Sequence, residues 1–503
     1  MKKRYLALLL TGLLAVSLLT GCSNEDNSAE SEGGQRDDVN IYCEGVWTDL
    51  DPHGAGCTTY TNMYLLNQMY EPLAHVADDG SIEPALATDW VISDDGKTYT
   101  FTIREGVKFH NGDDMTAADV AFSLNRAFEA AALQTYSSFV DHAEVVDDTT
   151  VNVILKEPFA PFLSYLEWYP IVSESFANGN DLHSSVCGTG PYKLESIDFN
   201  LECKMTAFED YWQEPASIKN VTFKAITEAT TASVAFESGD LDFFFCYNVS
   251  AYAPLQESGK YNTELVAQQH TAVILLNNSV PPLDNKLVRQ ALSYATDRET
   301  MIAIAYEGLA EPTYLMANTS SFGVTEEQFY NHYEYDLEKA KELLAEAGYP
   351  DGFDLGIMTV ISGSYHEKYA QVWQQSLAQI GVTVELVGSE SAVADTVDHN
   401  YVTATMGETF MSDFASTAQY YTGNNKTCYS NDRVTELFNL AAAETDSDKR
   451  LEYYSEAIDI IYDDATCIPI FNKQVPWVWD KDLNAVLSCD PGHPYYVYDM
   501  SWN

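Results

Sequence analysis

Apolar and polar positions follow their clearest pattern in residues 96–126. Residues 99–103 alternate apolar and polar side chains, which predicts a strand with one buried face. Thr116 stands three positions before Asp119, the spacing of a helix capping box, and apolar residues recur at helical intervals through 120–128. This segment therefore predicts a strand, a turn and an amphipathic helix.

A strand–helix–strand pattern recurs in the C-terminal half of the chain. Residues 355–361 form a short apolar run, 366–380 have the period of a helix, and 382–387 alternate as a second strand. Asp297 and Asp336 precede two further helical stretches at N-cap positions. A helix between two strands is typical of parallel pairing, so this half is predicted to be α/β with a parallel sheet at its centre.

The N-terminal segment predicts export. Three basic residues precede an apolar run, 5–19, that is shorter than the roughly 20 residues a membrane-spanning helix needs. The run ends in Leu19-Thr20-Gly21-Cys22, which resembles a bacterial lipobox. We therefore predict a lipoprotein signal peptide over 1–21 and a lipid on Cys22; an ordinary signal peptide with an incidental cysteine is the alternative. Residues 22–38 are polar and acidic, typical of a flexible tether.

Length and charge narrow the function classes. A chain of 503 residues is expected to form at least two domains. With 26 basic and 76 acidic residues the formal charge is -50, which excludes a nucleic-acid partner and adhesion to anionic lipid by charge. The acidity is typical of a protein that stays soluble outside the cytoplasm. A preference for cationic ligands is a second interpretation, which net charge alone does not decide.

Motifs of catalysis and metal binding are missing from the sequence. Its nine cysteines form no CxxC, its ten histidines no HExxH, and no GxSxG is present. His183 and Cys187 are four positions apart, but a lone pair is a weak sign of a metal site. We predict no catalytic residue, no metal and no cofactor. Missing motifs alone do not exclude an enzyme, because catalytic triads are recognised by geometry and not by sequence.

Several strings resemble one protein family. TYTFTIREGVKFHNG at 98–112, followed by TAADVAFSLNR at 116–126, resembles the signature block of the family 5 extracytoplasmic solute-binding proteins. These are oligopeptide- and dipeptide-binding receptors of ABC importers. The stretches 188–192, 288–308 and 336–353 continue the resemblance in the family's order, so that it spans essentially the whole mature chain.

The resemblance implies a two-lobed α/β fold like that of periplasmic binding proteins, with an extra β-rich subdomain. Lobe 1 would comprise 39–281 and 476–503, with the subdomain at about 76–187, and lobe 2 would comprise 282–475. The lobes would close on the ligand by a hinge motion.

The implied function is capture of peptides and their delivery to an ABC permease, with no reaction catalysed, so the resemblance implies that the protein is not an enzyme. The receptor would be a monomer, anchored by lipid on the outer side of the cytoplasmic membrane. The alternatives are a receptor for a nickel chelate, haem, an oligosaccharide or a signalling peptide, and an exported hydrolase on the same scaffold.

The resemblance also implies ligand-binding residues near the end of an apolar run. Asp413 would pair with the ammonium group of a peptide, and Met411 and Phe410 precede it in the same motif. The alternative role for Asp413 is an N-cap for a helix over 414–421. Phe410 replaces the family's usual Trp, and Lys368 is the nearest substitute for the arginine that binds a dipeptide carboxylate.

Three further aromatic residues are expected to line the cleft by the same resemblance. Trp47 follows the first strand, and Tyr136 and Phe139 lie in the loop after the signature helix. Ordinary core packing is the alternative for each. Cys43 stands where the dipeptide receptor has a paired cysteine, which implies a Cys43–Cys246 disulfide.

Overall fold

The computed structural model describes residues 36–503, except residues 79, 247, 248, 318–320, 330, 331, 411 and 490–492. The predicted signal peptide, Cys22 and nearly all of the predicted tether lie outside the described residues, as does Met411. Residues 37–503 form one unit. Its division at residues 281–282 and 475–476 into lobes stays a prediction.

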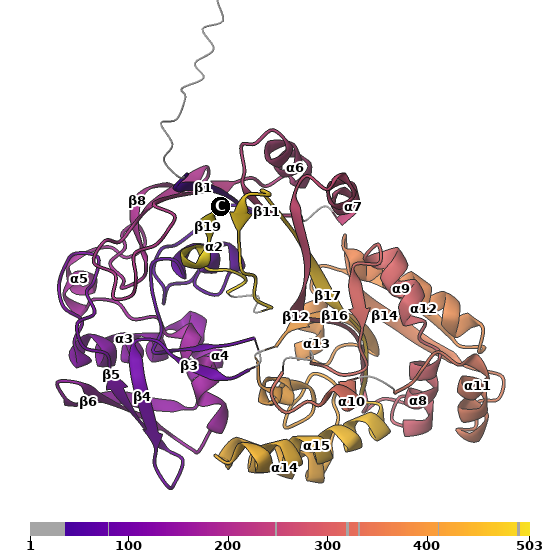
Figure 1. The fold of residues 1–503 in the computed structure, drawn as a ribbon. Coiled ribbons are helices and arrows are strands. Elements are labelled where there is room, and N and C mark those ends of the chain that lie inside the picture. Colours follow the sequence, from indigo (N-terminus) through magenta and orange to yellow (C-terminus); the bar gives the residue numbers. More distant parts are fainter. Residues whose placement is uncertain are drawn as a thin grey trace, which may run out of the picture. The chain divides into compact units, whose positions relative to one another are not determined.

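An eleven-stranded mixed sheet runs through this unit (Figure 1). The strand order is β15-β14-β16-β12-β17-β11-β1-β10-β9-β8, and β13 pairs with β17 outside this path. The strands are β1 Asp38–Cys43, β8 Tyr192–Asp198, β9 Glu202–Ala207, β10 Asn220–Ala225, β11 Phe243–Phe245, β12 Asn262–Leu276, β13 Ala310–Pro312, β14 Asp354–Ile361, β15 Thr383–Ser389, β16 Thr403–Thr409 and β17 Cys467–Trp479.

Two long antiparallel strands connect the N-terminal and C-terminal parts of this sheet. β12 and β17 pair from Asn262 opposite Trp479 to Leu275 opposite Cys467, with register shifts after Ala267 and Ala272. The sequence predicts only a short strand at 273–276, because the preceding residues are largely polar. Their backbone groups nevertheless pair with β17, so the strand is fifteen residues long. Figure 1 shows both strands running between the two parts.

The signature segment contributes β5 to a separate antiparallel sheet of order β4-β5-β7-β6. As predicted, the alternating side chains of β5 point their apolar members into a core, against which helix α3 packs. The capping box between Thr116 and Asp119 is confirmed. The elements are β4 Ala87–Ile92, β5 Thr98–Ile103, α3 Ala117–Glu129, β6 Val140–Asp147 and β7 Thr150–Leu155.

The predicted strand–helix–strand unit is also confirmed. β14 pairs in parallel with β15, and α12 (Tyr365–Ala378) connects them. The Asp297 side chain caps α9 (Arg298–Ala305), and the Asp336 side chain caps α11 (Leu337–Glu346). These helices and α8 (Lys286–Tyr294) cover one apolar cluster of the sheet.

The Gly-Thr-Gly-Pro-Tyr turn at 188–192 joins two distant segments. A Cβ atom on Gly188 would lie 2.0 Å from the Met69 carbonyl oxygen, and one on Gly190 would lie 2.7 Å from the Met69 carbonyl carbon. The His110 amide donates to the Gly188 carbonyl at 2.9 Å. Close backbone approach, more than the turn itself, therefore requires glycine at both positions.

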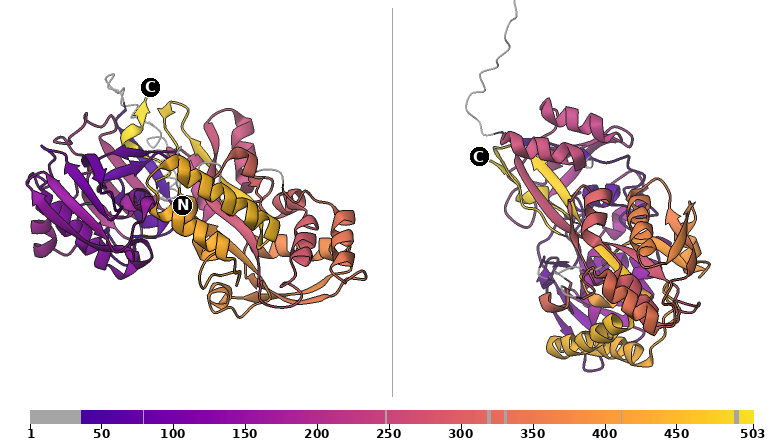
Figure 2. Two further views of the ribbon diagram at one scale, coloured as in Figure 1. Left: turned by 90° about the horizontal axis from the view of Figure 1, so that it is seen from below. Right: turned by 90° about the vertical axis from the view of Figure 1, so that its right-hand side faces the viewer.

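The remaining elements complete the fold. α14 and α15 pack against each other beside the C-terminal part of the sheet (Figure 2). None of the helices in the described part of the chain is long and apolar enough to cross a membrane. The other elements are α2 Tyr60–Leu66, β2 Ala74–Val76, β3 Ile82–Pro84, η1 Ala131–Leu133, α4 Gln134–Ser137, η2 Ala160–Trp168, α5 Glu174–Gly179, α6 Ala229–Glu237, α7 Val249–Ser258, α10 Glu326–Phe329, α13 Ala392–Val397, η3 Phe414–Tyr420, α14 Asp432–Ala443, α15 Ser447–Asp464, β18 Leu483–Asn484, η4 Val497–Asp499 and β19 Ser501–Trp502.

Candidate functional site

A cavity of about 310 Å³ lies between α2 and the end of β16. Its walls come from segments that are far apart in the sequence. The N-terminal part of the chain contributes Tyr60, Met63, Tyr136, Tyr165, Glu167 and Trp168, among others. The C-terminal part contributes Glu408, Thr409, Phe410, Ser412, Ser416 and Gln419, and His493 comes from the C-terminal tail.

Aromatic rings form much of the first wall. The ring of Tyr136 stacks on Trp168, with centroids 4.3 Å apart and planes 5° apart. Tyr165 lies beside Tyr136 at 6.3 Å, and Tyr60 lies on the same cavity. Such rings offer a ligand broad apolar faces together with hydroxyl and indole groups. The wall therefore suits an organic ligand with apolar and polar parts.

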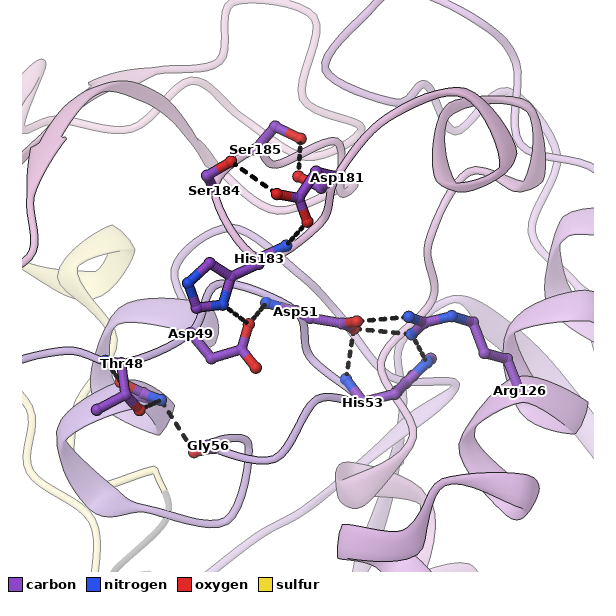
Figure 3. A network of polar contacts seen from close by, with 11 residues as sticks. Thr48, Asp49, Asp51, His53, Gly56, Arg126, Asp181, His183, Ser184 and Ser185 are labelled. Carbon is purple, nitrogen blue, oxygen red and sulfur yellow. Dashed lines mark hydrogen bonds and ion pairs between the residues drawn. The ribbon is translucent and has the colours of Figure 1, made fainter.

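The loop that leads to this wall is held by an ion pair (Figure 3). Asp51 accepts from Nη1 of Arg126 at 2.7 Å and from Nη2 as well, a bidentate arrangement. Arg126 is in α3, the helix of the signature segment, so the ion pair joins this loop to that helix. At the edge of the same network, Nδ1 of His183 lies 3.3 Å from Oδ1 of Asp49.

His53 extends this network in its neutral form. Arg126 donates to Nδ1 of His53 at 2.9 Å, so that nitrogen carries no proton, and Nε2–H then donates to the Pro170 carbonyl at 2.9 Å. Burial, and then the charge of Arg126, lowers the pKa of His53 to about 4. Burial raises the pKa of Asp51, but the bonds from Arg126 and the His53 amide outweigh it, so the pKa is lowered. The bonds of Asp51 and His53 thus fix the loop that precedes Thr58 and Tyr60 in the chain.

The second wall begins where β16 ends. Glu408 lines the cavity, and its carboxylate is paired with the Lys426 ammonium, which lies 5.1 Å from the ring centroid of Tyr420. Phe410 packs against Tyr420 at 5.9 Å and is 4% exposed. In the described part of this wall, the ammonium of Lys426 is therefore already engaged by Glu408.

A chain of hydrogen bonds joins the two walls. The Tyr60 hydroxyl lies 2.9 Å from Oγ1 of Thr409, which lies 3.1 Å from Nδ1 of His270. Nε2 of His270 lies 3.1 Å from the Tyr365 hydroxyl at the start of α12. His270 is on β12, next to its register shift. The contact between the walls is thus linked to the strand that connects the two parts of the sheet.

Asp413 has partners within the protein itself. Its Oδ2 accepts from Nη2 of Arg450 at 2.6 Å, and its Oδ1 accepts from the Tyr454 hydroxyl at 3.0 Å and from the Ala415 amide at 2.9 Å. The carboxylate caps η3, which was the predicted alternative. Asp413 is 4% exposed and does not line the cavity, although Ser412 beside it does. The protein itself therefore neutralises this carboxylate.

The other predicted site residues divide into two groups. Tyr136 and Phe410 line the cavity. Trp47 is 2% exposed within an apolar core, because it follows β1, a strand inside the large sheet, and Phe139 packs on Phe159 with ring centroids 4.2 Å apart. Neither lines the cavity, so for these two the structure shows the core role that was the alternative. Met411 and Cys22 lie outside the described residues.

Sequence reasoning missed several cavity residues. Tyr60, Glu167, Trp168 and His493 have no motif of their own, and only the density of aromatic residues around 165–169 hinted at a wall. Their proximity arises because α2, η2 and the C-terminal tail meet in the fold.

Cysteine and metal chemistry are limited in the described part of the chain. None of the eight cysteines in this part is in a disulfide, so the implied Cys43–Cys246 disulfide is not formed. Burial raises the pKa of each of these two thiols to about 12, which keeps them protonated and inert. Among the described residues, no group of three or more His, Cys, Asp or Glu side chains is arranged to hold a metal ion.

Comparison with known proteins identifies the family. Residues 81–431 match the model of the bacterial extracellular solute-binding proteins, family 5 Middle. The chain belongs to this family. Family 5 solute-binding proteins are the substrate-binding components of ABC importers, so the resemblance of the signature strings is confirmed.

Individual relatives agree with this assignment. The glutathione-binding protein GsiB of Salmonella typhimurium (strain LT2) is 31% identical over 476 residues, which cover 89% of this chain and 91% of the relative. The structure of HbpA2 from Haemophilus parasuis has a TM-score of 0.84 and 26% identity, covering 93% of this chain and 100% of that one. DppA from Helicobacter pylori in complex with peptide STSA, at 24% identity, shares the fold with a TM-score of 0.74 and covers 93% and 98% of the two chains. These neighbours confirm the predicted two-lobed α/β fold of this family 5 protein.

Proposed function

We propose that this family 5 protein captures peptides outside the cytoplasm and delivers them to the permease of an ABC importer. The observation that carries this proposal is the cavity whose walls come from both parts of the chain and meet at Tyr60 and Thr409. A ligand between such walls is enclosed when they approach, which commits it to transport as an intact molecule.

The lining suits a peptide. Tyr136, Tyr165 and Trp168 offer apolar and aromatic faces to side chains, and the hydroxyls of Ser412 and Ser416 offer hydrogen bonds to amide groups. The names of two similar proteins support this ligand class, because one binds glutathione and the other was solved with peptide STSA. Attachment through a lipid on Cys22 and the tether that follows it are part of the proposal.

Incubation of the purified protein with a complex peptide mixture tests the proposed peptide binding. After washing and mild release, mass spectrometry should find intact peptides on the purified protein. Tyr136→Ala removes one side of the aromatic wall and should reduce the retained amount, whereas Tyr335→Ala, on a residue that is exposed and outside the cavity, should not. Recovery of no peptide would contradict a peptide receptor, and shortened products would identify an exported hydrolase instead.

A further inference from the structure

A second cavity, of about 390 Å³, adjoins the first one. Val76, Glu167 and His493 line both cavities, so these residues lie between them. The second cavity is enclosed by residues around β2, by Tyr211 and Trp212, and by the C-terminal tail. A ligand longer than the first cavity would reach it by passing Glu167.

The charged lining of both cavities has a single sign. Neither cavity is lined by a lysine or arginine among the residues that the structure describes. Carboxylates, in contrast, line both. They are Glu167 and Glu408 in the first cavity, and Glu71, Asp78, Glu83, Glu167 and Asp499 in the second.

Lys426 and Arg104 lie behind these walls, and both are already engaged. Lys426 is paired with Glu408. The Arg104 guanidinium lies 4.2 Å from the ring centroid of Trp212, and its Nε donates to the Ala85 carbonyl at 2.9 Å. Neither cation therefore faces a ligand, and an anionic ligand would have to displace one of these contacts.

Not every carboxylate is available to a ligand. Glu71 accepts hydrogen bonds from Thr189, Tyr211 and Trp212, and burial raises its pKa. These bonds give Glu71 a structural role. Burial likewise raises the pKa of Asp499.

Glu167 lies at the junction of the cavities. Its Oε1 accepts from the Val76 amide at 2.9 Å and lies 3.7 Å from Nδ1 of His75, and its Oε2 lies 3.6 Å from Nδ1 of His493. The side chain is 8% exposed, which places the carboxylate in a medium where charge interactions are strong. His75 and His493 carry a charge only when they are protonated, unlike a lysine or an arginine.

Aromatic rings add to this preference. Tyr136 and Trp168 line the first cavity, and Trp212 and Tyr496 line the second. Ring faces attract an ammonium or guanidinium group and give no such advantage to a carboxylate. The carboxylates and the aromatic rings of the lining therefore both favour a cationic ligand.

We propose that the two cavities form one site for an extended ligand of net positive charge, whose cationic group is held at Glu167. This inference rests on the proposed peptide-binding function and deepens it, because it selects basic peptides over acidic ones such as glutathione.

A charge series of peptides tests the inference on the unmodified protein. Ala-Ala-Lys-Ala, Ala-Ala-Gln-Ala and Ala-Ala-Glu-Ala, with glutathione as a fourth probe, are titrated by calorimetry at low and high salt. The lysine peptide should bind at least tenfold more tightly than the glutamate peptide, and the difference should shrink as salt screens the charges. Equal affinities would overturn the preference but leave a peptide receptor intact, whereas no binding by any peptide of the series or of the complex mixture would contradict the proposed function itself.

Variants locate the cationic group. Glu167→Gln should bring the lysine and glutamate peptides within about threefold of each other, and Glu167→Asp, whose shorter side chain reaches less far, should lower the preference without abolishing it. The matched control is Glu105→Gln, an exposed glutamate outside both cavities, which should behave like the unmodified protein. Unchanged selectivity in a folded Glu167→Gln protein would exclude Glu167 as the group that holds the cation. If that variant does not fold, a smaller preference for the lysine peptide in Glu167→Asp, with unchanged affinity for the glutamine peptide, supports Glu167. A preference as large as that of the unmodified protein counts against it.

Discussion

The hydroxyl of Tyr60 lies 2.9 Å from Oγ1 of Thr409, although 349 positions separate the two residues in the chain. Tyr60 is the first residue of α2 and Thr409 the last residue of β16, and both line the same cavity. In a protein that closes by a hinge, a contact between opposite walls forms only when the walls approach each other.

The Tyr60–Thr409 contact should contribute to ligand binding. Tyr60→Phe and Thr409→Val each remove the bond, and each should weaken peptide binding by about 0.5–1.5 kcal/mol. The double variant should lose little more than either single variant, because both remove one interaction. Calorimetry with a peptide recovered from the mixture measures this. Tyr64→Phe, one turn further along α2, is the control, and fully additive losses would mean that the two hydroxyls act independently.

The ion pair of Asp51 with Arg126 should position the loop that carries Thr58. Asp51→Asn weakens a charged, bidentate bond, so the unfolding free energy should fall by about 1.5–3 kcal/mol, and peptide affinity should fall with it. Denaturant unfolding and calorimetry measure the two quantities. His183→Gln, at the exposed edge of the same network, should change neither by much. Unchanged peptide affinity in Asp51→Asn would show that this ion pair does not position the binding site.

Asp413 should matter for stability and not for affinity. Asp413→Asn leaves Arg450 buried without its carboxylate, so the unfolding free energy should fall by about 3–5 kcal/mol. Asp351→Asn, on an exposed carboxylate, is the control. A stable variant that no longer binds free-amine peptides, together with loss of binding when those peptides are N-acetylated, would instead restore Asp413 as the ammonium anchor.

The protein should lose stability in mild acid, partly through His53. The unfolded chain protonates this histidine below about pH 6.5. The folded protein does so only near its lowered pKa of about 4, because the site is buried beside Arg126. Between these values the unfolded state binds more protons, so the unfolding free energy falls as pH falls, by roughly 3 kcal/mol for this group.

Denaturant unfolding of His53→Gln at pH 7 and pH 4.5 checks this dependence. The variant should lose less stability between the two pH values than the unmodified protein does. His142→Gln, on an exposed histidine, should keep the full dependence. Identical pH dependence in His53→Gln and the unmodified protein would assign the acid sensitivity to other groups, such as His110, whose pKa burial also lowers to about 4.

The lipid anchor is tested by Cys22→Ala in cells. Acyl chains on Cys22 would hold the protein at the membrane, so the variant should move from the membrane fraction to the soluble fraction or the medium. Fractionation and detergent partitioning followed by immunoblotting measure this. A membrane-bound Cys22→Ala protein would exclude this cysteine as the anchor.

The sequence by itself determined the local elements and the family. Alternation over 99–103 and the Thr116 capping box depend on neighbouring residues, and both were predicted correctly. Asp297 and Asp336 were likewise identified as helix caps, because a cap is made by a side chain and an amide three positions away. The family resemblance rests on such strings and needs no knowledge of distant contacts.

Only the tertiary structure decided which residues line the cavity. Whether Asp413 meets a ligand or Arg450, and whether Trp47 lies in a cleft or a core, depends on partners far away in the chain. The polar residues of 262–272 gave no strand pattern, because their backbone bonds to β17 do not depend on side-chain polarity. The cavity at Tyr60 and Thr409 has the same origin: local patterns fix each element, whereas a site between elements exists only once packing brings them together.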